Sequence, residues 1–430
     1  MPPALTFLAE RDHPLRAALV EEMHVRRFPP FEAPARLSQL VMFTGEEQIE
    51  AARQCAEYLC ACFGVTPPKG RYFVVALGRL EFVWEQHTEV STYTFIQRGA
   101  FKHPFKHPVL LEAPANWIAS LPGQVLRATQ IAIMGGGVPP PDDTVLASCF
   151  APADLMCCEV QQHEARIWSD FRVHEDGMGR LLILDQALQS AADTARLVQR
   201  LQELGNYRNM ALLGLPVAQS ATPTLTALER RLATLAREIA AGSADDARLL
   251  DKVSTLAADL ARITAETRYR MSATRAYAQL VFDRMRSVDV MRIPGYQTLN
   301  DFTDRRLTPA VRTCESFTQR LEDLSQRVSW ASSLIRTRIE TTLERQNTAL
   351  LASMDHRAHL QLRLQQTVEG LSVVAISYYF IGILGYVAKL LNHTFPTLDA
   401  ALLQGAAAPV VLAFVWWLIH RVRRSHQDGA

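Results

Sequence analysis

Two stretches near the C-terminus consist almost entirely of apolar positions. Residues 370–388 read GLSVVAISYYFIGILGYVA, without Asp, Glu, Lys, Arg or His, and the apolar run continues past one lysine to residue 391. A second run covers residues 400–419. Because about 20 helical residues cross the roughly 30 Å hydrocarbon core of a bilayer, the pattern predicts two transmembrane helices, 370–391 and 400–419.

The connector between these runs, KLLNHTFPTLD, is short enough to form only an outer loop. It contains one basic residue, Lys389, whereas several basic residues flank the two runs on their other ends: Arg357, Arg363, Arg421, Arg423 and Arg424. The positive-inside rule therefore predicts a hairpin within 370–424, with the N-terminus and the tail 425–430 in the cytosol.

Small and polar residues inside the two runs are typical of closely packed transmembrane helices. We expect this packing at Ser372, Ser377, Gly382, Gly385, Gln404 and Gly405. No Asp, Glu, Lys or Arg lies within 370–388 or 400–419, so the sequence indicates neither a proton relay nor a charge-selective ring.

Residues 186–369 show helical periodicity, which predicts a helical bundle or coiled-coil stalk. Apolar residues recur at spacings of three and four from Leu225 to Ile239, and the pattern resumes after AAGSADD in a long helix, antiparallel to the first, over 243–293. TLNDFTDRR predicts a short connecting helix, and Pro309 suits the first turn of a longer helix that continues into the membrane. Such heptads predict a homo-oligomer formed through the stalk and the transmembrane helices.

Residues 1–185 mix helix and strand patterns, which predicts an α+β domain with a sheet. EEQIEAARQCAEYLCACF is amphipathic at helical spacing. The segments predicted as strands are RYFVVALG, LEFVWEQ, VSTYTFIQ, QVLRATQIAIM, RIWSDFRV and RLLILD, and GAFKHPFKHPVLLEAPANW is predicted as a loop.

Composition narrows the function classes. The 45 basic and 44 acidic residues leave a net charge of +1, so we expect no nucleic-acid partner. The seven cysteines form no CxxC pair, and neither the histidines nor the glycines follow a metal or phosphate-loop spacing, so we expect no metal and no cofactor. The N-terminus has no apolar core typical of a secretory signal.

Two groups of ionisable residues are candidate binding sites. Glu85, His87 and Glu89 alternate along a predicted strand, which would place them on one face. A second group consists of Asp170, Arg172 and His174. Solvated strand faces have the same pattern, and no nucleophile, base and orienting group are spelled out, so we expect no enzyme. A weaker hypothesis is an enzyme that uses His87 with Glu85 or Glu89.

Five segments, 13–34, 80–95, 168–183, 198–216 and 361–379, resemble an uncharacterised family of membrane-anchored proteins of proteobacteria, catalogued as a domain of unknown function. The most specific part is the motif where the chain would enter the membrane: Gln365, Gln366, Thr367, Val368, Glu369 and Gly370. The resemblance implies a Gram-negative inner membrane and a two-helix anchor, but no reaction or ligand.

The layout also looks like that of CorA-type magnesium channels, which have an α/β body, a long helix and two C-terminal transmembrane helices. The Gly-Met-Asn motif of those channels is absent, since this chain reads GYVAKLLNHTF at that place. We therefore expect an oligomeric scaffold or sensor in the inner membrane without catalytic activity. The alternative is a homo-oligomeric CorA-like ion channel or transporter that lacks this filter. The sequence identifies no protein partner.

Overall fold

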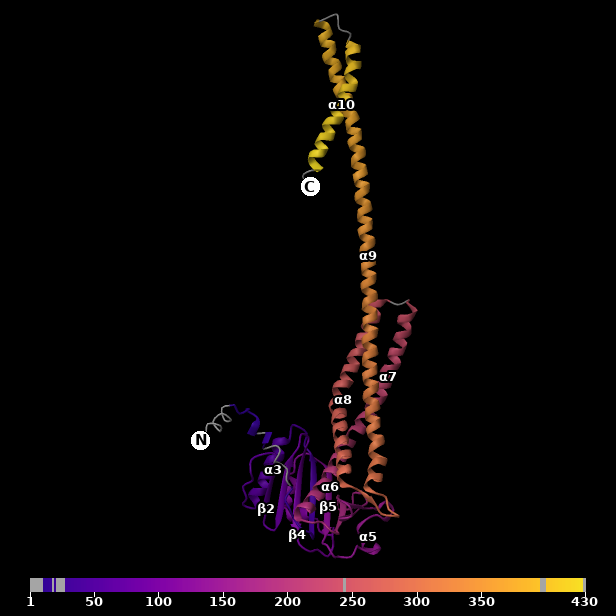
Figure 1. Ribbon diagram of the computed structural model, residues 1–430. Coiled ribbons are helices and arrows are strands. Elements are labelled where there is room, and N and C mark those ends of the chain that lie inside the picture. The colour runs from indigo at the N-terminus through magenta and orange to yellow at the C-terminus, as the bar shows by residue number, and fades with distance from the viewer. Residues whose placement is uncertain (1–10, 18, 21–27, 243–244, 395–399, 428–430) are drawn as a thin grey trace. The chain divides into compact units, whose positions relative to one another are not determined.

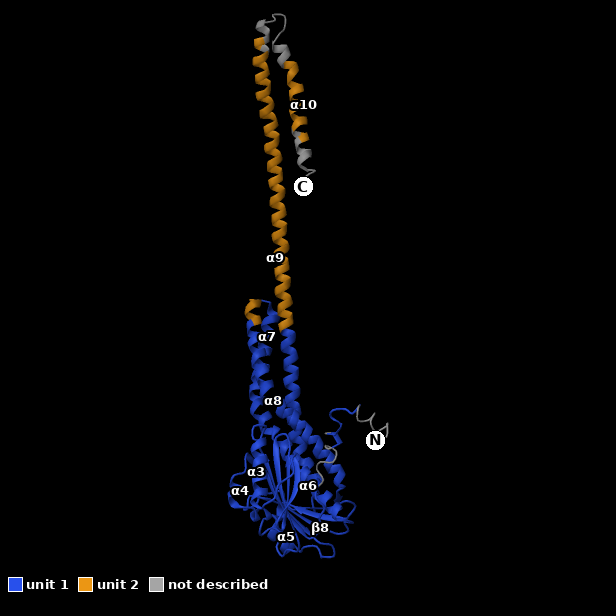
Figure 2. Ribbon diagram, turned by 90° about the vertical axis from the view of Figure 1, so that its left-hand side faces the viewer, with its two compact units in different colours: residues 1–244, 251–331 blue, residues 245–250, 332–430 orange. Residues whose placement is uncertain are grey.

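The computed structural model describes residues 11–17, 19–20, 28–242, 245–394 and 400–427, of which 388, 391–394, 400–404, 419 and 422–427 are described by their backbone alone. The chain divides into two compact units (Figure 2). Unit 1 consists of the residues up to 244 and of 251–331, and unit 2 of 245–250 and 332–430. The fold class is α+β, as the sequence predicts.

Within the described part of unit 1, nine strands form one mixed sheet in the order β2-β3-β4-β1-β5-β8-β7-β6-β9. Figure 1 labels β2, β4 and β5 of this sheet. The strands are β1 (Ala35–Phe43), β2 (Tyr72–Leu77), β3 (Leu80–Gln86), β4 (Val90–Arg98), β5 (Gln124–Met134), β6 (Met156–Val160), β7 (Ala165–Ser169), β8 (Gly179–Asp185) and β9 (Met291–Arg292). Among these pairings only β5 with β8 is parallel.

The helical elements are α3 (Ile49–Cys62), η1 (Val109–Glu112), α4 (Ala115–Ala119), α5 (Asp143–Cys149), η2 (Pro152–Asp154), α6 (Ala191–Leu212), α7 (Gly214–Ala241), α8 (Asp246–Val288), α9 (Leu299–Thr394) and α10 (Ala400–Gln427). Helices α8 and α9 each contribute residues to both units.

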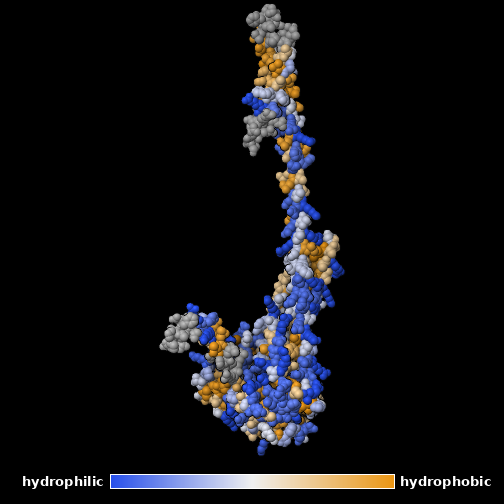
Figure 3. Space-filling model, viewed as in Figure 1, coloured by the Kyte–Doolittle hydropathy of each residue, from blue (hydrophilic) through white to orange (hydrophobic). Residues whose placement is uncertain are grey.

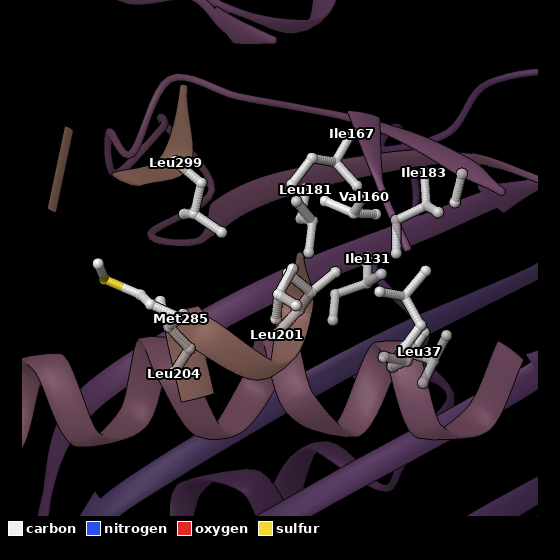
Figure 4. Packing of buried hydrophobic residues seen from close by; sticks show 14 of the residues in the cluster. Leu37, Ile131, Val160, Ile167, Leu181, Ile183, Leu201, Leu204, Met285 and Leu299 are labelled. Atoms are coloured by element: carbon white, nitrogen blue, oxygen red, sulfur yellow. The ribbon is translucent and has the colours of Figure 1, made fainter. Parts of the chain in front are cut away.

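Helices cover both faces of the sheet. On one face, strand residues such as Ile131 and Leu181 pack with Leu201 and Leu204 of α6, Met285 of α8 and apolar residues at the start of α9 (Figure 4). On the other face, α3 and α4 cover the β2-β3-β4-β1 half, and α5 covers the β5-β8-β7-β6 half. Because side chains alternate along a strand, each buried strand contributes side chains to the apolar packing on both faces of the sheet.

The predicted strands are confirmed as β2, β3, β4, β5, β7 and β8, although β7 ends at Ser169 and not at Val173. The sequence did not reveal β1, β6 or β9. Strand β1 is buried on both faces, so its apolar and polar positions do not alternate, and its buried polar residues include Ser38 and Gln39. The segment predicted as a loop over 99–117 contains η1 and the first three residues of α4.

The predicted helices before residue 300 are confirmed as α3, α7 and α8. Arg231 of α7 pairs with Asp259 of α8 at 2.7 Å, and Glu238 pairs with Lys252 at 2.7 Å, so the two helices are antiparallel as expected. Helix α8 ends at Val288 and not near residue 293, because the chain turns at a left-handed residue there and Met291–Arg292 pairs with β6.

The expected break before Pro309 is wrong. Helix α9 begins at Leu299 and includes Pro309, with no separate connecting helix. Its start is fixed by a reciprocal cap: the Asp301 amide donates to Thr298 Oγ1, and the Thr298 amide donates to Asp301 Oδ2, each at 3.1 Å. This capping box begins the helix well ahead of the proline.

In unit 2, hydrophobic residues gather along the C-terminal part of α9 and on α10 (Figure 3). Within the described ranges, one helix is long and apolar enough to cross a membrane, judged by length and composition, and 11% of its apolar window is buried. A shorter apolar helix covers Gly405–Leu418. Residues 389–394 of the predicted connector are the last residues of α9, whereas its remainder, 395–399, and the last residues of the tail, 428–430, lie outside the described residues.

Candidate functional site

The first candidate cluster lies at the end of β3. This strand ends at Gln86, so the alternation inferred from the sequence does not reach Glu89. His87 Nε2 lies 3.5 Å from Glu85 Oε1, and both residues line a cavity of about 30 Å³ beside α6. Glu85 and His87 therefore lie together, whereas Glu89 pairs with another element.

Glu89 forms a buried ion pair with Arg270 of α8. Arg270 Nη1 donates to Glu89 Oε2 at 3.1 Å and Nη2 donates to Oε1 at 2.5 Å, while Tyr277 Oη donates to Oε2 at 3.4 Å. Burial, and then the Glu89 charge, raise the pKa of Tyr277. The pair joins the β3–β4 turn to α8, and its two residues lie 181 positions apart in the sequence.

The second candidate cluster organises the loop 170–178. The buried Asp170 carboxylate accepts the Ala151 amide at 2.9 Å and the Arg172 amide at 3.2 Å, and its Oδ2 lies 3.1 Å from His174 Nε2. The Arg172 guanidinium donates from Nε to Asp154 at 2.5 Å. Among the described contacts none joins this cluster to Glu85, His87 or Glu89.

A cavity of about 350 Å³ lies behind this loop. The β5–β8 pairing begins at Thr129↔Gly179, so the first five residues of β5 extend beyond the start of β8. The loop 170–178 and α6 close the space left there. Its apolar wall includes Leu181, Leu201, Leu204 and Leu299, which are labelled in Figure 4.

Arg127 reaches this cavity from the extended part of β5. Its Nη1 donates to Gln39 Oε1 at 3.1 Å and to Asn206 Oδ1 at 2.9 Å. The guanidinium lies flat against α6 at Gly205, where an added Cβ would stand 2.7 Å from Cζ and Nη2. Glycine at this helix position therefore leaves the space that the Arg127 guanidinium occupies.

Arg208, one turn further along α6, also lines the cavity. Its Cζ lies 4.6 Å from the centre of the Phe171 ring, which stacks on Phe302 at 3.8 Å. Arg306 also contacts this pair, with its Cζ 3.9 Å from the Phe302 ring centre. The Nη1 of Arg208 is buried and has no hydrogen-bond partner among the described atoms.

The positive charge at this cavity is only partly compensated. Arg172 and Arg180 have carboxylate partners, Asp154 and Asp176, but no described carboxylate pairs with Arg127 or Arg208. Burial, followed by repulsion from Arg208, lowers the pKa of Arg127 to about 9, and burial followed by repulsion from Arg306 lowers the pKa of Arg208 to about 10. An anion bound here would raise the pKa of both arginines towards its ordinary value, because it would stabilise their charged forms.

Sequence reasoning did not single out Arg127, Gly205 or Arg208. The available signals were a basic residue inside a predicted strand and a glycine inside a helix. Neither signal reveals the site by itself, because Arg127 lies 79 residues from its partner Asn206.

The residues predicted for the membrane-proximal motif make local contacts within α9. Gln365 Nε2 donates to Glu369 Oε1 at 3.4 Å, and Thr367 Oγ1 donates to the Arg363 carbonyl at 2.8 Å. Gln366 is exposed, and a Cβ added to Gly370 would meet no described atom within 4 Å.

The predicted packing residues of unit 2 differ in their surroundings. Ser377 and Gly385 are buried, whereas Ser372 is exposed and donates to the carbonyl four residues earlier, at 2.9 Å. A Cβ added to Gly382 or Gly405 would meet no described atom within 4 Å. The side chain of Gln404 lies outside the described residues.

The part of the chain that the structure describes contains no group of three or more His, Cys, Asp or Glu side chains able to hold a metal ion. Residues 11–426 match the family described as Protein of unknown function (DUF3422). The chain belongs to this family. The DUF3422 match includes both candidate clusters, the cavity and both apolar stretches. No curated protein and no solved structure matches the chain.

Proposed function

We propose that this chain is a multi-pass protein of the bacterial inner membrane, anchored by a hairpin of residues 370–391 and 400–419, with both termini in the cytosol. The exposure of the apolar part of α9 carries the proposal: Leu371, Val374 and Ile383 expose 71%, 66% and 61% of their surface. Removing such a side chain from water is worth about 1.5–3 kcal/mol, and a bilayer provides that environment along a whole helix.

Packing within unit 2 supports the hairpin. Ser377 of α9 is 1% exposed, and Val411 and Val415 of α10 are 7% and 5% exposed, although most of their neighbours face outward. Small or β-branched residues buried at helical spacing are typical of helix contacts inside a bilayer.

We infer self-association through the α9 segment before the membrane, with a second copy of this chain as the partner. Leu343, Leu350 and Leu364 are spaced by multiples of seven and are 53%, 60% and 67% exposed. A coiled coil between copies would bury these leucines as a seam, with Arg357 at the heptad position between Leu350 and Leu364. The other basic and acidic residues nearby suit solvent-exposed flanking positions.

The role that we propose is that of a scaffold or sensor without catalytic activity. The two clusters of histidine and carboxylate residues support it, because Glu89 and Asp170 use their oxygens to join elements of the fold. A CorA-like channel is the alternative, favoured by the continuity of α9 from Leu299 to Thr394. If the purified protein conducted cations across liposome membranes, the channel hypothesis would replace the scaffold hypothesis.

Membrane extraction tests the anchor. The wild-type chain should stay in the membrane pellet after alkaline carbonate treatment, and a reporter fused after Ala430 should be active only in the cytosol. Ile383→Arg should reduce insertion, since an arginine at the centre of a transmembrane helix costs about 2.5–3.5 kcal/mol. Leu362→Arg, at a 55% exposed site of the same helix outside the apolar run, is the matched control. Recovery of the wild type in the soluble fraction, or a periplasmic reporter, would refute the anchor.

The mass of the detergent-solubilised protein tests self-association. Leu350→Glu should shift the protein towards the monomer, because it places a charge in the seam. Leu362→Glu, on the opposite side of the helix, should not. A wild-type monomer would exclude the coiled coil and leave the anchor unaffected.

A further inference from the structure

The cavity beside α6 combines unbalanced positive charge with an apolar wall. Arg127 and Arg208 both line it, and no described carboxylate pairs with either one. The partners of Arg127 are two neutral amide oxygens, which accept hydrogen bonds but do not neutralise a cation. Burying a charge without a counter-charge is costly, so this arrangement requires a compensating feature.

We propose that the cavity binds a small amphiphilic oxyanion, with a carboxylate or phosphate group held between Arg127 and Arg208 and an apolar body against Leu181, Leu201 and Leu204. Arginine suits this role because its planar group donates two parallel hydrogen bonds to an oxyanion. The cavity volume of about 350 Å³ falls within the roughly 300–1,000 Å³ typical of small-molecule sites. The proposal goes beyond membrane anchoring and does not depend on it.

A purely structural role explains the two arginines less well. A structural cross-link would use the donors of the guanidinium fully, yet the described hydrogen bonds of Arg127 all come from Nη1, and Nη1 of Arg208 is buried without an acceptor. The Phe171 and Phe302 rings hold the Arg208 group in place through stacking, but they accept no strong hydrogen bond. Donors that are fixed and unused are what an incoming oxyanion needs.

Gly205 allows a test that spares the fold. The three atoms nearest to a Cβ here all belong to the guanidinium end of Arg127, at 2.7–2.8 Å, which a flexible side chain can vacate. Alanine also favours a helix over glycine by up to about 1 kcal/mol. Gly205→Ala should therefore displace Arg127, and the helix preference of alanine should offset part of the cost of the two hydrogen bonds lost with it.

The experiment measures ligand-induced shifts of thermal unfolding and calorimetric binding on the full-length protein in non-ionic detergent. The probes are hexanoate and hexyl phosphate, compared with inorganic phosphate, hexanol and hexylammonium. The variants are Gly205→Ala and Arg208→Met. Arg200→Met is the matched control, because this arginine lies on the same helix and donates to the Ser287 carbonyl at 3.2 Å, away from the cavity.

We expect saturable binding of hexanoate or hexyl phosphate, and the stronger of the two identifies the anionic group. Each cavity variant should weaken binding by about 10- to 100-fold, the loss expected for one charge-assisted hydrogen bond, and Arg200→Met should not. Hexanol or inorganic phosphate binding as tightly as the amphiphilic anions would overturn the proposal. So would unchanged affinity in Gly205→Ala and Arg208→Met. Binding in detergent is independent of membrane insertion, so failure of the anchor would leave these results unaffected.

Discussion

The ion pair between Glu89 and Arg270 gives a quantitative prediction for the stability of unit 1. The side chains are 4% and 15% exposed, so water screens the pair only slightly from the Arg270 side. Removing one partner of a buried pair costs about 3–5 kcal/mol, because the other charge stays buried without compensation. With the remaining exposure of Arg270, we expect Arg270→Met to cost about 3 kcal/mol, the lower end of that range.

Thermal unfolding of the full-length protein in detergent measures this effect. A loss of that size should lower Tm by on the order of 5–15 °C. The double variant Glu89→Met with Arg270→Met removes both charges and should recover most of the loss, because apolar replacements of a whole buried pair are often neutral or stabilising. A Tm change below about 2 °C for Arg270→Met, or a double variant less stable than the single one, would refute the reasoning.

Three further predictions concern the helices. Gly214→Ala should destabilise the protein by about 1–3 kcal/mol, because its Cβ would stand 2.2 Å from Thr274 Oγ1, and adding Thr274→Ala should recover part of the loss in thermal unfolding. Ser190→Ala should remove the N-terminal cap of α6 and cost about 1 kcal/mol, visible as faster amide exchange in the first helical turn. The hydrogen bonds from Arg320, and then its charge, lower the pKa of Glu229. The resulting contribution to folding stability is complete above the ordinary Glu pKa of about 4.3 and is lost as the pH falls through the lower pKa of the folded state. Glu229→Gln should therefore flatten the acid side of a plot of unfolding free energy against pH.

Local patterns predicted β2, β3, β4, β5, β7 and β8, because these segments combine apolar residues with β-branched or aromatic ones. They failed at β6 and β9 and at β1, which is central and buried on both faces. Its polar residue Gln39 contacts Thr94 of β4 at 3.2 Å and accepts from Arg127. A glutamine that serves such contacts interrupts the hydrophobic pattern from which strands are recognised.

The candidate site was predicted less well for a related reason. Asp170, Arg172 and His174 were selected as ionisable neighbours in sequence, and they organise the loop that borders the cavity. The two arginines without carboxylate partners come from different segments, and their environment depends on Gly205 and Phe302, which sequence spacing alone does not relate to them. The signal that distinguishes them is an absent counter-charge, a property of the folded chain.

The pairing of β9 with β6 has a consequence for synthesis of the protein. Glu159 of β6 is registered with Met291 of β9, so this edge of the sheet remains open until the ribosome has made all of α6, α7 and α8. During that interval the hydrogen-bonding groups of Met156–Val160 are available to strands of other chains. Nascent chains stalled before residue 291 should therefore be especially prone to aggregate and to require chaperones.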